Sequence, residues 1–415
     1  MNRCVITREI LRGREYLIQA LFDESGKMTE VFPELAGAGS ILGNIYIGRV
    51  EKVQKNLNAA FIRIAPGQNC YLPLKDLAHP VFTRKQSAKK EIVQGDELLV
   101  QVIREAVGTK DPTVTTNLSF SGTYAVLTTG KRKLCVSAKL SKEEREHYRR
   151  MLPESGDTDY GIIIRTNAAS VPDETVLAEI GELEARCRKL IAEAGHRTCH
   201  SLLHRELPFC VRYAMDQKQK YLSEIVTDDR SVFEELCAAY HISPDRLMTG
   251  GSVSVPVTEI ETEAGPRLRH YPDEKISLSA LYSIKHGIEE ALRERVWLKS
   301  GACLVIQPTE ALTVIDVNSG KNVTKGEAQE TYRRVNLEAA REIARQLRLR
   351  NISGIVIVDF ISLASREAEA ELLALLKQEF REDPVPVQVV DMTRLGLVEL
   401  TRKKERKPLR EAVLC

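Results

Sequence analysis

ALTVID, residues 311–316, and GIVIVD, residues 354–359, are two apolar runs that each end on an aspartate. Glu327 to Arg350 lies between them and repeats apolar residues at helical spacing. Further elements flank this core: strand-like ACLVIQ (302–307), a helix at 367–380 and strand-like VPVQVVD (385–391). The order β-β-α-β-α-β predicts an α/β unit in which right-handed crossovers set the last three strands parallel.

The composition is that of a globular chain of several domains. Its 415 residues are 43% apolar, which allows substantial cores. Lys and Arg total 60 against 58 Asp and Glu, so the net charge of +2 does not argue for nucleic-acid binding and any basic surface must be local. The nine Cys contain no C-x-x-C pair, which argues against a disulfide framework. No run approaches the roughly 20 apolar residues of a membrane span, so a cytoplasmic protein without membrane contact is expected.

Short alternating runs predict β structure in the first part of the chain. Residues 3–32 predict two or three antiparallel strands that need a later segment to complete their sheet. Five strand-like runs follow, NIYIGRVEKV, AAFIRIA, NCYLPL, DELLVQVIREA and PTVTTNLSF, and they match an OB-type barrel. Phe61 and Tyr71 lie on two of these strands, where they are either stacking platforms for single-stranded bases or core filling.

The middle of the chain mixes strands and helices. Ser141 and Glu144 have the spacing of a capping box at the start of a charged helix. A second, amphipathic helix is expected from Pro172 to Ala194. Residues 275–300 are expected to be helical and include the only Trp of the chain, Trp297.

Asp316 and Asp359 end neighbouring strands of the predicted sheet, so both carboxylates are expected at one sheet edge, where open α/β sheets place ligands. Mg²⁺ takes one or two carboxylates and keeps waters and substrate phosphate oxygens, so the pair suits phosphoryl transfer. Mn²⁺ also favours oxygen ligands and stays an alternative. The Asn318 amide could orient a water or a phosphate oxygen beside the metal. The structural alternative is that these residues only cap the following loops.

Two basic segments offer further contacts. The helix at 327–350 carries four Arg at helical spacing: Arg334, Arg341, Arg345 and Arg348. This stripe either faces an RNA backbone or forms salt bridges with nearby Glu residues. The salt-bridge interpretation is favoured. The run RKKERKPLR at residues 402–410 either contacts phosphate or belongs to a frayed tail.

Long ordered motifs resemble the catalytic region of the ribonuclease E/G family over nearly the whole chain. These motifs are N-I-Y-I-G-R-V, A-A-F-I, C-Y-L-P-L, G-T-K, T-T-N-L-S-F-S-G, I-I-I-R-T-N, P-T-E-A-L-T-V-I-D-V-N-S-G-K, N-L-E-A-A-R-E-I-A-R-Q-L-R-L-R-N, G-I-V-I-V-D-F-I and R-L-G-L-V-E-L-T-R-K. The resemblance implies an α/β and α+β multidomain fold. Its implied parts are a split RNase-H-like domain (1–37 and 208–280), an OB-fold domain of the S-one type (38–119), a 5′-sensor domain (120–207), a DNase-I-like catalytic subdomain (281–401) and a basic tail (402–415).

The resemblance also implies roles for single residues. By motif position, Asp316 and Asp359 match the family's magnesium ligands and Asn318 the polar residue beside them. The RNA-gripping positions of the OB domain fall on three residues: Phe61, Tyr71 and Lys110. The pocket for a 5′-monophosphate falls on four: Gly122, Val126, Arg165 and Thr166. Tyr71 replaces the more usual Phe and keeps a stacking face.

Two departures from the family pattern bear on these expectations. The basic pair that the family often places after the second sensor strand reads Ala138-Lys139, which weakens the expected preference for a 5′-phosphate. The chain ends at Cys415, where relatives continue into a C-P-x-C metal-binding segment and a small dimerising domain. A lone Cys cannot supply the four thiolates of that link, so neither zinc nor the zinc-linked tetramer is expected, and the oligomeric state stays open.

The function that the resemblance implies is magnesium-dependent endonucleolytic cleavage of single-stranded RNA in rRNA and mRNA processing and decay. It favours 5′-monophosphorylated substrates and leaves 5′-phosphate and 3′-hydroxyl ends. Two rivals stay open: a non-catalytic RNA-binding protein derived from this family, and a metal phosphohydrolase acting on a small nucleotide. The second leaves the barrel aromatics without a role.

Overall fold

The computed structural model describes residues 2–36, 41–77, 79–88, 91–106, 111–130, 132–152, 159–215, 222–240, 242, 259–260, 262, 266–271, 273, 275–320 and 328–414. The chain forms two compact units, which we call the barrel unit (39–220) and the two-sheet unit (1–38 with 221–415). In the part of the chain described, no helix is long and apolar enough to cross a membrane.

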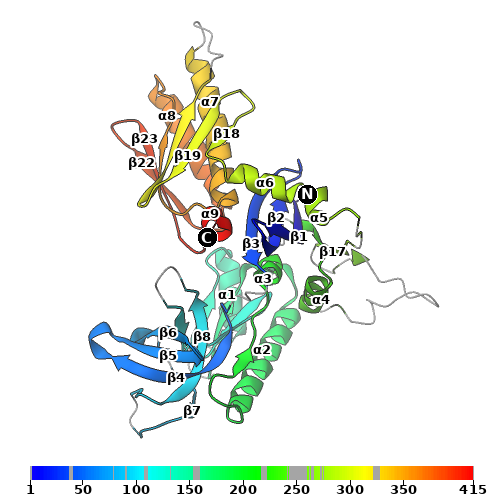
Figure 1. Ribbon diagram of the computed structural model, residues 1–415, viewed down its shortest axis with the longest axis vertical. Helices are drawn as coiled ribbons and strands as arrows, with labels where there is room; N and C mark the ends of the chain where they lie inside the picture. Colours follow the sequence, from blue (N-terminus) through cyan, green and yellow to red (C-terminus); the bar gives the residue numbers. More distant parts are fainter. Residues whose placement is uncertain are drawn as a thin grey trace, which may run out of the picture. The chain divides into compact units, whose positions relative to one another are not determined.

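A closed barrel of five strands forms the first half of the barrel unit (Figure 1). The strands are β4 (Ile45–Gln54), β5 (Ala59–Ala65), β6 (Gln68–Pro73), β8 (Glu97–Arg104) and β9 (Thr113–Thr115). The short parallel pairing of β6 with β9 and the antiparallel pairing of β4 with β8 close the ring. β7 (Phe82–Arg84) pairs beside β8, and β14 (Leu202–His204) pairs beside β4. An OB-like barrel, as predicted, is therefore present.

Alternation of apolar and polar residues produces this barrel. On β5, Ile62 and Ile64 are fully buried in the barrel core, whereas Arg63 between them points outward. Gly48 lies where β4 passes close to β5, since a Cβ at this position would lie 2.4 Å from the Ile62 side chain. A larger residue would force the strands apart.

The second half of the barrel unit is a four-stranded sheet covered by helices. Its strand order is β10 (Ser119–Ser121), β11 (Ala125–Thr128), β13 (Gly161–Ile164) and β12 (Leu134–Val136). The helices that pack on it are α1 (Lys142–Met151) and α2 (Asp173–Ala194), and the unit also contains α3 (Phe209–Met215). The predicted capping box between Ser141 and Glu144 is present at the start of α1. The apolar face of α2 packs into the core of this sheet.

The first sheet of the two-sheet unit joins the N-terminal strands to a later segment, as expected. It contains β1 (Asn2–Leu11), β2 (Arg14–Phe22), β3 (Met28–Leu35), β15 (Leu222–Thr227), β16 (Glu259–Ile260) and β17 (Arg267–His270). β1 pairs with β2 antiparallel and with β15 parallel. The associated helices are α4 (Arg230–Ala239), α5 (Leu278–Leu281) and α6 (Ile284–Ala291).

The second sheet, which we call the carboxylate sheet, has six strands in the order β18-β19-β20-β21-β23-β22. Their bounds are β18 (Arg295–Trp297), β19 (Cys303–Pro308), β20 (Leu312–Asn318), β21 (Gly354–Asp359), β22 (Val387–Met392) and β23 (Leu397–Arg402). α7 (Ala328–Leu349) and α8 (Arg366–Glu379) lie along this sheet (Figure 1) and share one apolar core with it. The predicted α/β unit is therefore present.

Two expectations for this region are wrong, and a third is confirmed but incomplete. The single helix expected over 275–300 is two short helices, α5 and α6, the second of which ends at Ala291, and Trp297 lies on strand β18. β20, β21 and β22 do share a direction, but β23 lies between β21 and β22, antiparallel to both. The expected basic tail is not frayed at residues 409–414, because these form α9 and bury Leu409 and Val413 in the core beside the first sheet.

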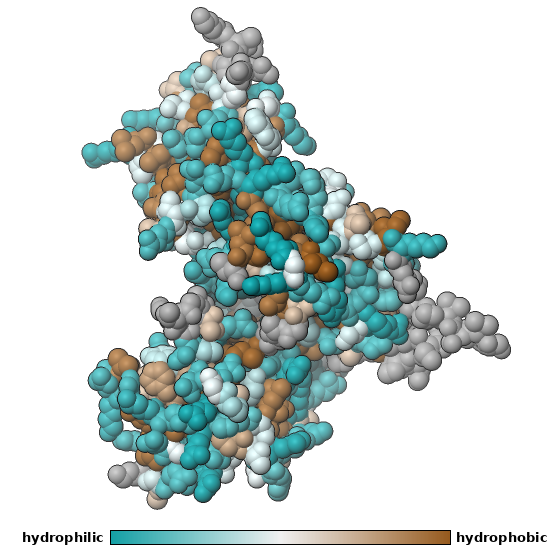
Figure 2. All heavy atoms as spheres, viewed as in Figure 1, coloured by the Kyte–Doolittle hydropathy of each residue, from teal (hydrophilic) through white to brown (hydrophobic). Residues whose placement is uncertain are grey.

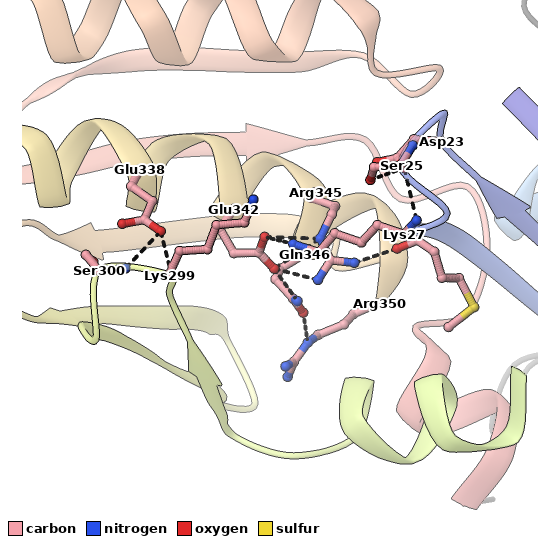
Figure 3. A network of polar contacts seen from close by, with 11 residues as sticks. Asp23, Ser25, Lys27, Lys299, Ser300, Glu338, Glu342, Arg345, Gln346 and Arg350 are labelled. Atoms are coloured by element: carbon pink, nitrogen blue, oxygen red, sulfur yellow. Dashed lines mark hydrogen bonds and ion pairs between the residues drawn. The ribbon is translucent and has the colours of Figure 1, made fainter. Parts of the chain in front are cut away.

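A polar network ties α7 to the β2–β3 hairpin (Figure 3). Glu342 on α7 accepts a hydrogen bond from Lys27 Nζ at 2.8 Å and pairs with Arg345 one turn later. Arg345 in turn donates to the backbone carbonyl of Met28. The helix behind the carboxylate sheet is thus fixed to the first sheet by charged contacts as well as by packing.

Candidate active site

Asp316 and Asp359 lie side by side at the end of two adjacent parallel strands. They are direct register partners of β20 and β21. Asn318 Nδ2 donates to Asp316 Oδ2 at 2.6 Å, so the amide orients that carboxylate. Asp359 and Asn318 are exposed and Asp316 is half-buried. The structure therefore brings together the three residues that the sequence singled out on this sheet.

The carboxylates occupy the face of the sheet that the helices leave uncovered. Their neighbours Ile315, Val317 and Val358 point to the other face and are buried against α7 and α8. Side chains alternate across a strand, so Asp316, Asn318 and Asp359 share the uncovered face. Figure 2 shows hydrophobic residues exposed among polar ones over this part of the chain. We call the face of the sheet that carries Asp316, Asn318 and Asp359 the open face.

The residues fit a magnesium ion. Two adjacent carboxylates repel each other, and a divalent cation between them would offset that repulsion. Among the residues described, no group of three or more His, Cys, Asp or Glu side chains is arranged to hold a metal. A carboxylate pair on an open surface agrees with an ion that keeps several waters and takes phosphate oxygens from a substrate.

A buried amide supports the segment that follows Asp359. Asn336 on α7 is fully buried. Its Nδ2 donates to the carbonyl of Ile361 at 2.7 Å, and its Oδ1 accepts from the Ile361 N–H at 3.1 Å. This residue was not predicted from the sequence. The signal was an Asn on the apolar side of the helix, next to Val335, where a polar group needs a specific partner.

The barrel residues Phe61 and Tyr71 are register partners on β5 and β6. Their rings meet edge to face with centroids 6.1 Å apart. Both are half-buried on the outer side of the barrel and do not belong to its core. The core-filling alternative is therefore wrong, and their role in stacking stays a prediction. Lys110, the third residue of this group, lies outside the described residues.

The predicted 5′-sensor residues meet at one end of the four-stranded sheet. Val126 pairs with Ile163, and the Arg165 N–H donates to the carbonyl of Tyr124 at 2.8 Å. Gly122 closes the turn before β11 by donating to the carbonyl of Ala125 at 2.9 Å. The hydroxyls of Ser137 and Thr166 lie 2.8 Å apart. The structure brings these four residues to one place, and their binding of phosphate stays a prediction.

Glu179 on α2 holds the turn of this region and was missed from the sequence. Its carboxylate is buried and accepts hydrogen bonds from the backbone N–H groups of residues 123, 124 and 125 at 2.8–2.9 Å. A Cβ on Gly122 would lie 2.4 Å from Glu179 Oε1, so a larger residue there would displace Glu179 from its hydrogen bonds. Because the acceptor is far away in the sequence, only the fold reveals the pairing.

Arg341 and Arg345 of the α7 stripe form ion pairs, as the salt-bridge interpretation predicts. Arg345 pairs with Glu342 and is half-buried, and Arg341 lies 3.8 Å from Glu379 on α8. Glu338 instead accepts from the backbone N–H of Lys299 at 2.7 Å. The helix packs on the face of the carboxylate sheet opposite Asp316 and Asp359. An RNA lying over the open face would therefore not meet the stripe.

Comparison with known proteins gives consistent matches. The model of the ribonuclease E/G family matches residues 119–405. The chain is 33% identical to a ribonuclease E of Nostoc sp. over 97% of its length, and 31% identical to the ribonuclease G of Salmonella typhimurium over 94%. It is 30% identical to the ribonuclease E of Haemophilus influenzae over 96%. The chain spans 57% of the Nostoc protein, 78% of the Salmonella protein and 42% of the Haemophilus protein.

Proposed function

The chain belongs to the ribonuclease E/G family, and on this premise we propose that it is a magnesium-dependent endoribonuclease. It cleaves single-stranded RNA in the processing of rRNA and the decay of mRNA. The observation that carries the proposal is the pair Asp316 and Asp359, in register on adjacent strands and on the uncovered face of their sheet.

The chain's own residues bind and orient the substrate at this pair. Asp316 and Asp359 would hold the metal through carboxylate oxygens, and Asn318 keeps the Asp316 carboxylate oriented through the 2.6 Å hydrogen bond. When bound, Mg²⁺, for which Mn²⁺ is the alternative, would supply Lewis-acid polarisation of the scissile phosphate and would make a water acidic enough to serve as the attacking group. Attack in line with the leaving oxygen yields 5′-phosphate and 3′-hydroxyl ends. No side-chain nucleophile is required.

Substrate selection rests on the barrel unit. Phe61 and Tyr71 present ring surface on the outer side of the barrel, where unpaired bases can stack. Arg165 and Thr166, with Gly122 and the backbone near it, form the pocket for a 5′-monophosphate, since a guanidinium and a hydroxyl are both donors to phosphate oxygens. A 5′-monophosphorylated RNA is therefore the preferred substrate.

The proposal extends to the domain arrangement. The first sheet of the two-sheet unit, which joins β1 to β15, corresponds to a split RNase-H-like domain interrupted by the barrel unit. The carboxylate sheet with α7 and α8 corresponds to a DNase-I-like catalytic subdomain. The boundaries expected from the sequence stay predictions.

Cleavage of a labelled single-stranded oligomer, with and without Mg²⁺, tests the proposal. Wild-type protein is expected to cut internally only with the metal. Asp316→Asn removes a negative ligand and is expected to abolish cleavage while RNA binding persists. Glu310→Gln is the matched control, because Glu310 is an exposed carboxylate at the opposite end of β20 and should not matter. Full activity of the Asp316 variant refutes the site.

The same assay separates the proposal from its rivals and tests 5′-end sensing. A non-catalytic RNA-binding protein would bind the oligomer and leave it intact, and a nucleotide phosphohydrolase would act on mononucleotides but not on the oligomer. Comparing 5′-monophosphate and 5′-hydroxyl oligomers then tests the sensor. Equal cleavage rates would remove Arg165 and Thr166 from the account.

A further inference from the structure

Trp297 is the only tryptophan of the chain, and it is 69% exposed. It ends β18, the edge strand of the carboxylate sheet. A large aromatic ring loses favourable burial when it stands in water, and exposed aromatic rings are the side chains on which unpaired bases stack. Neither the proposed metal site nor the barrel uses it.

Register places this ring on the open face. Trp297 pairs with Cys303 on β19, and Cys303 pairs with Asn318 on β20. Val296 between Arg295 and Trp297 packs against the core under the sheet, so its two neighbours point to the other face. Trp297 therefore lies in one row with Asn318, on the face that carries Asp316 and Asp359.

The separation suits a nucleotide next to the scissile phosphate. Adjacent strands lie about 4.8 Å apart and residues rise about 3.4 Å along a strand. Trp297 is two strands from Asn318, which is two residues from Asp316, so the Cα atoms of Trp297 and Asp316 lie roughly 12 Å apart. A side chain as long as Trp covers part of this distance.

Charge on the same strand favours a polyanion over an apolar partner. Arg295 is exposed on the open face and lies in the row of Asp316, through Val305. A cation beside a stacking ring is the combination with which proteins hold single-stranded nucleic acid. A scissile phosphate at Asp316 and Asp359 would also bring its flanking nucleotides over this face.

We propose that Trp297 is a stacking platform for an RNA base flanking the scissile phosphate, with Arg295 contacting the neighbouring backbone. This inference rests on the proposed function and adds a base-binding position to it. It predicts that the site discriminates against an abasic nucleotide at that flanking position, because an abasic sugar has no ring to stack.

Tryptophan fluorescence tests this directly, because every change in emission comes from one residue. Asp359→Asn protein is titrated with a single-stranded oligomer carrying a fluorescent end label, and binding is followed separately by the anisotropy of that label. Stacking is expected to quench the emission of Trp297 in step with binding. Unchanged emission on saturation with RNA overturns the proposal.

Kinetics of ring variants supply the second readout. Trp297→Ala is expected to raise KM roughly 5- to 100-fold with kcat little changed, since one stacked base is lost in ground and transition states alike. Trp297→Phe keeps a ring and should recover most of the affinity. Ile10→Ala, which removes another exposed apolar side chain, from β1, is the control and should cleave as wild type.

An abasic substitution completes the test. An abasic nucleotide beside the cleaved bond should weaken wild-type binding and leave Trp297→Ala unaffected. An equal loss of RNA affinity in wild type and Trp297→Ala overturns the proposed contact between the Trp297 ring and the base. Emission that depends on protein concentration without RNA also overturns it and assigns Trp297 to contact with a second copy.

The outcomes distinguish this inference from the proposed function. If wild-type protein cleaves the oligomer, while RNA does not quench the emission of Trp297 and Trp297→Ala does not change KM, only the stacking proposal fails. If RNA quenches Trp297 but is never cleaved, the catalytic proposal fails and the base contact stands. Absence of both binding and cleavage refutes the two together.

Discussion

Replacement of Asn336 by Leu should both destabilise the two-sheet unit and slow cleavage. Leu has the branching and the number of side-chain heavy atoms of Asn, so the change removes the two hydrogen bonds to the backbone of Ile361, while its bulkier methyl groups add some crowding. Each buried backbone group left without a partner costs about 1–3 kcal/mol. Two such groups would together cost about 2–6 kcal/mol. Ile361 is half-buried and keeps some access to water, so we expect the lower part of that total, about 2–4 kcal/mol.

The loss of stability has a measurable size. For a unit of this length, each kcal/mol shifts Tm by about 2–4 °C. Calorimetry of Asn336→Leu should therefore show a melting temperature lowered by roughly 5–15 °C. Lys377→Ala is the control, because Lys377 is exposed on α8 and such surface changes stay within about 0.5 kcal/mol.

The functional effect follows from position. Ile361 lies two residues after Asp359. Without the two hydrogen bonds its backbone is less fixed, and the Asp359 carboxylate can move away from Asp316. A displacement of about 1 Å at a catalytic group can cost about 100-fold in rate. Single-turnover cleavage at a temperature well below the lowered Tm should fall by about 10- to 100-fold. Wild-type Tm and wild-type rate in this variant would refute the role of the amide.

Two further predictions concern Glu342 and Glu179. Burial alone would raise the pKa of Glu342, but hydrogen bonds and charge from Arg345, with smaller contributions from neighbours, lower it from 4.5 to about 2. A carboxylate whose pKa is lower in the folded than in the unfolded state stabilises the fold at pH values above the unfolded pKa. Glu342→Gln should therefore lower the free energy of unfolding at pH 7, measured by urea titration, by about 3 kcal/mol. This deficit should shrink as the pH falls from about 4.5 towards 2, and an equal deficit at pH 3 and pH 7 would contradict the prediction. Glu179→Gln loses a charged acceptor for the N–H groups of residues 123–125 and should reduce the ratio of cleavage rates for 5′-monophosphate over 5′-hydroxyl RNA, with the 5′-hydroxyl rate unchanged. A fall in both rates alike would mean that Glu179 only stabilises the fold.

Much of the site could be predicted from the sequence because its geometry is local. An apolar run that ends in Asp predicts a strand end, and a helical crossover predicts that the next strand lies parallel beside it. That was enough to place Asp316 next to Asp359, as the register shows. The outward position of Phe61 and Tyr71 was left open, because a half-buried aromatic obeys the same alternation whether it faces the core or solvent.

What the sequence could not supply depended on distant partners. β23 was missed although it alternates, and it ends on the charged residue Arg402. Arg402 is buried because its guanidinium makes two hydrogen bonds to the Asp383 carboxylate, at 3.0 and 3.1 Å. Trp297 was assigned to a helix because β18 is only three residues long and exists through its pairing with β19.

The central claim is that Asp316 and Asp359 hold the metal ion that cleaves RNA. The most direct measurement is the rate of cleavage of a labelled single-stranded oligomer as a function of Mg²⁺ concentration, for wild-type and Asp359→Asn protein at equal RNA occupancy. We predict a rate that saturates with Mg²⁺ for the wild type and no cleavage at any concentration for the variant. A variant that reaches the wild-type rate with the same dependence on Mg²⁺ would contradict the claim.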